Sequence, residues 1–194
     1  MRSVTLKMGI AATMVALPTL VMAHPGHEHA SSFMTGLMHP MGGLDHLLAM
    51  LAVGLWAASI GGKAMWMLPL AFISAMLLGG GLAIAGIQMP FVEQGILLSV
   101  ILVGVLLVAS ARFSIATCAS IAGLFALFHG TAHGVEMPLN ANGVEYALGF
   151  IAATFALHIT GMALGTLVTR LQAPLMTRLA GSVIAIAGVI LAIA

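Results

Sequence analysis

Two short clusters of histidine and carboxylate residues interrupt an otherwise apolar chain. The first cluster lies in the stretch HPMGGLDH and consists of His39, Asp45 and His46. The second lies in FHGTAHGVE and consists of His129, His133 and Glu136. Imidazole and carboxylate groups together are ligands for divalent transition metals. Because ionisable side chains are costly to bury in hydrocarbon and are usually functional there, the clusters predict a metal path through a membrane.

The spacing of the second cluster fits one face of a helix. His129 and His133 are four residues apart, which places their Cα atoms ~6 Å from each other on the same face, and Glu136 follows three residues later. Gly130 and Gly134 form a pair of small residues that would let another helix approach closely. The pattern favours two histidines that converge on one ion. The alternative is that both are hydrogen-bonded to neighbouring helices.

The first cluster raises a question of geometry. On one straight helix His39 and His46 would lie ~10.5 Å apart along the axis, which is awkward for one ion whose nitrogen ligands approach to ~2.1 Å. Pro40 and the two glycines that follow it can interrupt the helix, and broken helices are common at transporter sites. Equally, Pro40 could be an early helical position with His39 just outside. Asp45 supplies negative charge for a dication, or else it pairs only with His46.

Four further histidines are secondary candidates for metal binding: His24, His27, His29 and His158. His158 has no carboxylate partner nearby in the sequence, so it is either a ligand or a hydrogen-bonded core residue. The other three belong to a tail that could bind metal or be merely solvated and disordered. Methionines near His39, namely Met34, Met38 and Met41, raise a copper hypothesis, although methionine is more often a flexible gap-filler.

The composition is that of a polytopic all-α membrane protein. The chain has 194 residues, of which 61% are hydrophobic and 6% charged, with a mean hydropathy of +1.17. A net charge of +1 gives no basic surface for nucleic acid. No phosphate-binding glycine-rich loop is present, so the chain contains no ATPase domain. Its single cysteine, Cys118, cannot form an intrachain disulfide.

The chain divides into three parts. Residues 1–23 are typical of a cleavable signal peptide, with Arg2 and Lys7 before a short apolar core and a small-residue cleavage site at Ala23. Residues 24–33 are expected to form a histidine-containing external tail. Residues 34–194 are expected to form a six-span membrane domain. An uncleaved first span is the alternative, but its ~14 apolar residues are fewer than a crossing needs.

Six apolar segments are each roughly long enough to span: 34–60, 64–87, 94–111, 113–133, 144–168 and 175–194. The basic residues of the connections fall on one side: Lys63, Arg112, Arg170 and Arg178. That side is then cytoplasmic and the mature N-terminus is outside, with Glu93, Glu136 and Glu145 on the outer side. A continuous first helix would place His39 in its shallow part. Asp45 and His46 would then lie ~15–20 Å deep, near the midplane with His158.

Together, HPMGGLDH and FHGTAHGVE resemble the paired motifs of the HupE/UreJ family of bacterial nickel permeases, which are associated with hydrogenase and urease maturation. The resemblance implies that residues 34–194 are a multi-pass permease domain of the bacterial inner membrane, with the mature N-terminus in the periplasm. It also implies import of Ni²⁺, or Co²⁺, with both motifs at the transport site. The residues alone predict only a divalent-metal site. Nickel is then the transported ion, no cofactor is expected to stay bound, the bilayer is a partner, and a homo-oligomer is left open.

Three other functions use the same residues differently. An intramembrane metal-dependent hydrolase could activate water at a histidine-bound metal, with Glu136 as general base. A membrane cytochrome could use the histidines as haem ligands, although the carboxylates beside them favour a dication. A divalent-metal exporter would need the same site as an importer.

Overall fold

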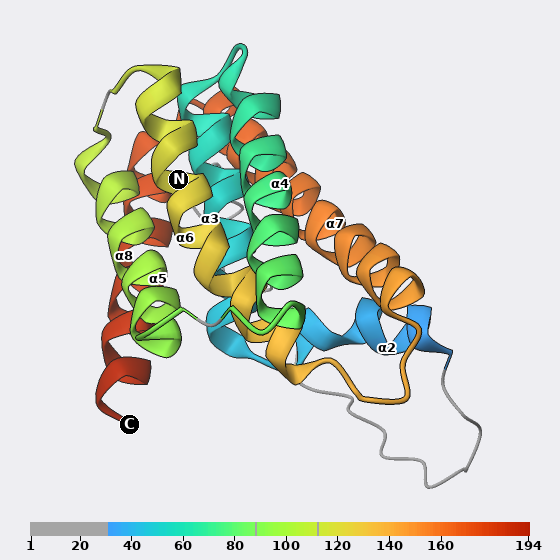
Figure 1. Cartoon of the computed structure of the whole chain (residues 1–194). Coiled ribbons are helices and arrows are strands. Elements are labelled where there is room, and N and C mark those ends of the chain that lie inside the picture. Colours follow the sequence, from blue (N-terminus) through green and yellow to red (C-terminus); the bar gives the residue numbers. More distant parts are fainter. Residues whose placement is uncertain (1–30, 88, 112) are drawn as a thin grey trace, which may run out of the picture.

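The computed structural model describes residues 31–87, 89–111 and 113–194. The predicted signal peptide and the histidines of the external tail, His24, His27 and His29, lie outside these ranges. Within them every regular element is a helix, which confirms the all-α prediction (Figure 1). Among the described residues, five helices are long and apolar enough to cross a membrane, and the number is six if one bent pair is counted as a single span.

The helices follow the predicted segments closely, except for the first segment. In chain order they are α2 (Ser32–Met38), the 3-10 helix η1 (His39–Met41), α3 (Leu44–Ile60), α4 (Ala64–Ile84), α5 (Val92–Ala109), α6 (Ile115–Glu136), α7 (Gly143–Arg170) and α8 (Pro174–Ile193). Helices α4 to α8 begin and end within a few residues of the apolar segments that predict them, because turn residues such as Gly61 and Pro174 mark their limits.

The first predicted span is broken. The part from Ser32 to Met41 meets α3 at an angle of 81°, and α2 lies across the end of α7 (Figure 1). Pro40 supplies no backbone N–H, and Gly43 at the start of α3 has an extended backbone with φ −114° and ψ 123°. The prediction that Asp45 and His46 lie near the midplane assumed one continuous helix, and the structure breaks that helix just before them. Both residues are in the first turn of α3.

Three close helix pairs build the bundle, namely α4 with α6, α3 with α7, and α5 with α8. Glycines face a neighbouring backbone in each pair. A Cβ added to Gly54 of α3 would meet Cα of Gly161 in α7 at 3.0 Å, and one added to Gly181 of α8 would meet the Gly104 carbonyl of α5 at 2.7 Å. These close approaches are typical of membrane helices, because association there depends on packing of small residues.

Two glycines of the second motif hold α6 against α4. A Cβ on Gly130 would overlap the Met76 carbonyl oxygen, and one on Gly134 would lie 2.6 Å from the Gly80 carbonyl oxygen. The prediction that these glycines admit another helix is therefore confirmed. The face of α6 next to the one that carries the two histidines is thus fixed against α4.

Charged side chains separate to the two ends of the bundle. In the described part of the chain, one end carries the basic residues of the connections and helix termini, Lys63, Arg170 and Arg178. The other end carries α2 and the acidic residues at helix termini, Asp45, Glu93, Glu136 and Glu145. Arg112 lies outside the described ranges. This distribution agrees with the predicted orientation, in which the end with α2 faces outward.

Candidate metal centre

The two sequence clusters meet where the first turn of α3 packs near the last turns of α6. One ligand atom from each of His46, His129 and His133 lies within 4.8 Å of the other two. A second group of the same kind is formed by His39, His133 and Glu136. His133 belongs to both groups, so the structure brings the two motifs into one continuous site.

The imidazole rings form a chain that runs from the surface into the bundle. The ring centroids are 4.8 Å apart for His39 and His133, 4.4 Å for His133 and His46, and 5.0 Å for His46 and His129. The side chain of His39 is 25% exposed, that of His133 is 5% exposed, and His129 is completely buried. An ion that entered at His39 could therefore pass from ring to ring toward the interior.

Asp45 lies behind His46 rather than in either group of ligand atoms. Its Oδ1 accepts a hydrogen bond from Nδ1 of His46 at 2.9 Å and another from the His46 backbone N–H at 2.8 Å. With Nδ1 bound to the carboxylate, the free nitrogen of His46 is Nε2, which is buried and has no hydrogen-bond partner among the residues that the structure describes. A carboxylate that holds the second nitrogen of a histidine fixes the ring orientation and makes the first nitrogen a better ligand.

Ser99 of α5 has the same relationship to His129. Its Oγ donates to the Ile96 carbonyl oxygen at 2.6 Å and lies 3.0 Å from Nε2 of His129. Because the single hydroxyl hydrogen is used on Ile96, Ser99 accepts from Nε2–H, and Nδ1 of His129 keeps a lone pair. That Nδ1 is buried, and no described residue hydrogen-bonds to it. Sequence analysis missed Ser99, although a serine within an apolar segment is a signal of the same kind as the histidines.

Glu136 links the partly exposed end of the ring chain to its buried part. Its Oε2 is 2.9 Å from Nε2 of His39 and 3.9 Å from Nδ1 of His133. The Glu136 side chain is 54% exposed, whereas neither nitrogen of His133 has a hydrogen-bond partner in the described residues. The alternative in which His129 and His133 serve only as hydrogen-bonded core residues therefore leaves His133 unexplained.

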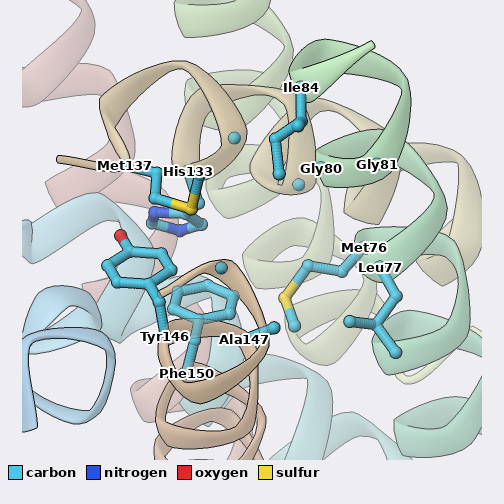
Figure 2. A pocket seen from close by; sticks show the side chains of 13 residues that line it. Met76, Leu77, Gly80, Gly81, Ile84, His133, Met137, Tyr146, Ala147 and Phe150 are labelled. Carbon is cyan, nitrogen blue, oxygen red and sulfur yellow. The ribbon is translucent and has the colours of Figure 1, made fainter. Parts of the chain in front are cut away.

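A cavity of about 170 Å³ between α4, α6 and α7 reaches His133 from the side. Figure 2 shows His133 beside Tyr146 and Phe150, with Met76 and Leu77 across the cavity. The Phe150 ring packs against His133 with a centroid distance of 4.1 Å. Most of the lining residues are apolar or glycine, so this side of His133 offers an ion few ligands.

His158 and the methionines near His39 lie apart from the two ligand groups. His158 is completely buried in the middle of α7, and neither group includes it. The methionines are exposed: Met34, Met38 and Met41. The copper hypothesis therefore gains no support from buried thioether groups beside His39.

Comparison with known proteins assigns the chain to a family. The family model described as HupE / UreJ protein matches residues 12–191. The chain belongs to the HupE/UreJ family. A protein HupE from Rhizobium leguminosarum bv. viciae is 44% identical over 174 residues, which cover 90% of this chain and 91% of that protein. No solved structure matches the chain.

Membership confirms the resemblance carried by the two motifs and gives the coarse function. HupE/UreJ proteins are membrane proteins of nickel and cobalt permease type. The matched region includes every described histidine of the centre, so the geometry can be interpreted as that of a HupE/UreJ protein.

Proposed function

We propose that the protein imports Ni²⁺ across the bacterial inner membrane through the centre formed by His46, His129 and His133, and so supplies the maturation of nickel enzymes. The observation that carries the proposal is the convergence of three imidazoles from two helices that are ~80 residues apart in sequence. Each imidazole has a buried nitrogen that makes no hydrogen bond within the described part of the chain. Imidazole suits nickel, zinc and copper alike. The choice of nickel, with cobalt as the alternative ion, rests on family membership.

The spacing of the three nitrogens suits an ion that binds and leaves. Two nitrogens on one ion at ~2.1 Å each can be at most ~4.2 Å apart, whereas those of the centre lie within 4.8 Å of one another. Each of the three imidazole rings therefore needs to move toward the ion by less than ~1 Å for all three nitrogens to bind it. Three neutral ligands bind a dication less tightly than a set of carboxylates or thiolates, which favours exchange.

The other polar residues of the two motifs, and Ser99, have roles in this proposal. Glu136 and His39, which are partly exposed, would capture the hydrated ion at the outer end. Asp45 and Ser99 would hold His46 and His129 with one free nitrogen each toward the ion. The histidines of the external tail, 24–33, would raise the local metal concentration.

The membrane potential is sufficient to drive import without ATP. A dication that enters a cytoplasm negative by 100 mV gains ~4.6 kcal/mol, which is twice ~2.3 kcal/mol per charge. That free energy corresponds to an accumulation on the order of 10³-fold. Binding of the imported ion by an apo-metalloenzyme would add to it.

The test is uptake of radiolabelled nickel by cells that lack other nickel importers and express the chain, with cobalt and zinc as competitors. We expect saturable accumulation in cells with the unmodified chain and none above background with His129→Ala or His133→Ala at equal membrane levels. Loss of cellular nickel would instead indicate an exporter. Wild-type uptake by both variants would remove the centre from the transport path.

The hydrolase alternative differs in how the metal behaves. A hydrolase keeps its metal through many turnovers, so the purified protein would hold a stoichiometric ion that does not exchange. For a permease, we expect the purified protein to bind nickel weakly and to exchange it rapidly. The purified protein should also lack a haem absorption spectrum, because the carboxylates of the centre favour a dication over haem.

A further inference from the structure

His158 is a buried imidazole that the three-histidine centre does not use. It is completely buried in α7, and neither Nδ1 nor Nε2 has a hydrogen-bond partner among the described residues. A neutral imidazole carries one donor and one acceptor, and burying both without partners costs stability. An apolar side chain of similar size would fill the same space without that cost, so packing does not explain the choice of histidine.

Phe72 of α4 links His158 to the centre. The Phe72 ring centroid lies 5.4 Å from that of His129 and 5.1 Å from that of His158. Phe72 is itself buried. Helix α7 begins, and α6 ends, at the end of the bundle that carries α2. His158 is 15 residues from that end of α7, or ~22 Å along the helix axis, whereas His129 is only seven residues from that end of α6. His158 is therefore the deeper of two imidazoles that contact one aromatic ring.

A hydroxyl and a thioether lie on the same helix faces, one turn from His158 and Phe72. Thr154 is four residues before His158 on α7, and Met76 is four residues after Phe72 on α4. The Thr154 hydroxyl donates to Met76 Sδ at 3.9 Å. Other threonines of α7 donate to the carbonyl oxygen four residues earlier, as Thr160 and Thr166 do. Thr154 instead turns toward α4, so its oxygen is available in the buried contact between α4 and α7.

We propose that His158 is an inner binding station for the same dication, reached from His129 past the Phe72 ring, with the Thr154 hydroxyl and the Met76 thioether as its neighbouring weak donors. The proposal rests on the proposed function and adds a second site in series. An ion that leaves His129 then has a ligand ahead of it in the middle of the bilayer, where no ligand from the two motifs reaches.

The proposal is tested by nickel binding to the purified full chain and by uptake in cells, each with His158→Ala. At saturating Ni²⁺ we expect the variant to bind one ion fewer per chain than the unmodified protein, as measured by equilibrium dialysis. In cells we expect the maximal uptake rate to fall on the order of tenfold, while the half-saturating nickel concentration changes little because the outer centre is intact. Equal binding and an equal maximal rate would overturn the proposal.

Two further variants separate a ligand from a packing role. Met162→Ala removes a buried side chain one turn beyond His158 on α7 and should bind as many ions as the unmodified chain. In a Cys118→Ala background, His158→Cys restores a metal donor, so we expect it to bind one Cd²⁺ more than His158→Ala in the same background. Two results would contradict the inner binding station. One is that Met162→Ala binds as few ions as His158→Ala; the other is that His158→Cys binds no more Cd²⁺ than His158→Ala in the Cys118→Ala background.

The nickel-binding measurement also allows the His158 site to be tested separately from nickel import. If the unmodified chain does not take up nickel but His158→Ala still binds one ion fewer, import is wrong and the His158 site is supported. If uptake occurs and His158→Ala matches the unmodified chain in both assays, import is supported and the inner station is wrong.

Discussion

The carboxylate of Asp45 fixes the imidazole of His46 through a hydrogen bond to Nδ1 of the ring. Oδ1 of Asp45 lies 2.9 Å from Nδ1 of His46, and the same oxygen accepts the His46 backbone N–H. One carboxylate oxygen thus ties both the ring and the main chain of the first turn of α3. Because this contact occupies Nδ1, the nitrogen of His46 that is left for a metal ion is Nε2. Asp45 therefore acts on the ion through His46.

Replacement of Asp45 should weaken nickel capture by way of the His46 ring. Asp45→Asn retains an oxygen acceptor without the charge, and we expect the half-saturating nickel concentration to rise by ~10–100-fold, as for other carboxylates behind metal-bound histidines. Asp45→Ala should abolish uptake at low nickel. Glu145→Gln is the matched control, because Glu145 is an exposed carboxylate at the same end of the bundle. Asp45→Ala uptake equal to that of the control would exclude this role.

Ser99→Ala should impair the centre although Ser99 reaches no ion itself. The substitution leaves Nε2–H of His129 without its acceptor, and a buried unpaired donor costs ~1–3 kcal/mol. His129 is then expected to turn or change tautomer, and the apparent nickel affinity should fall about tenfold, as measured by uptake over a range of nickel concentrations.

Matched variants test whether the Ser99 effect comes from the hydroxyl. Ser99→Thr keeps the acceptor and should retain most of the affinity. Ser59→Ala removes another serine hydroxyl, one that bonds only the Trp56 carbonyl oxygen, and should leave uptake unchanged. If Ser99→Ala and Ser59→Ala behave alike, the tautomer argument for His129 fails.

Glu136→Gln should act at the capture step. Its side chain is 54% exposed and joins His39 to His133, and loss of the charge removes the attraction for a hydrated dication. We expect uptake at low nickel to be lost and to return when nickel is raised at least ~10-fold, which corresponds to ~1.4 kcal/mol of binding. A lowered maximal rate with an unchanged half-saturating concentration would place Glu136 elsewhere in the cycle.

Gly130→Ala should lower the stability of the protein rather than alter its chemistry. The added Cβ would overlap the Met76 carbonyl oxygen, and a backbone cannot yield as a side chain can, so we expect a loss of ~1–3 kcal/mol. A lower thermal midpoint of the purified protein would show it. Gly81→Ala is the control, since nothing lies within 4 Å of its added Cβ. Equal midpoints for the two variants would contradict the close α4–α6 contact.

The sequence predicted those parts of the fold and site that depend on local pattern. Apolar length alone placed α4 to α8, because a helix must satisfy its own backbone hydrogen bonds in lipid. Helical periodicity placed His129 and His133 on one face, and the structure shows them on the face that meets His46. Pro40 with the adjacent glycines allowed two arrangements, an interrupted helix or a helix that begins near Pro40, and the structure has a break before α3.

Other features depend on which helices become neighbours, and the sequence could not supply them. The 81° break places Asp45 and His46 in the first turn of α3, whereas the depth predicted for them was counted along one straight helix. Ser99 supports His129 only because α5 packs beside α6. The contact of Phe72 with both His129 and His158 likewise requires α4 to lie against α6 and α7.

The most direct test of the central claim is to locate nickel in a crystal of the full chain by anomalous scattering at the nickel absorption edge. The account predicts a nickel peak ~2.1 Å from one ring nitrogen each of His46, His129 and His133, the nitrogen of His46 being Nε2 and that of His129 being Nδ1. Nickel found only away from these three rings, in a protein that still takes up nickel in cells, would contradict it.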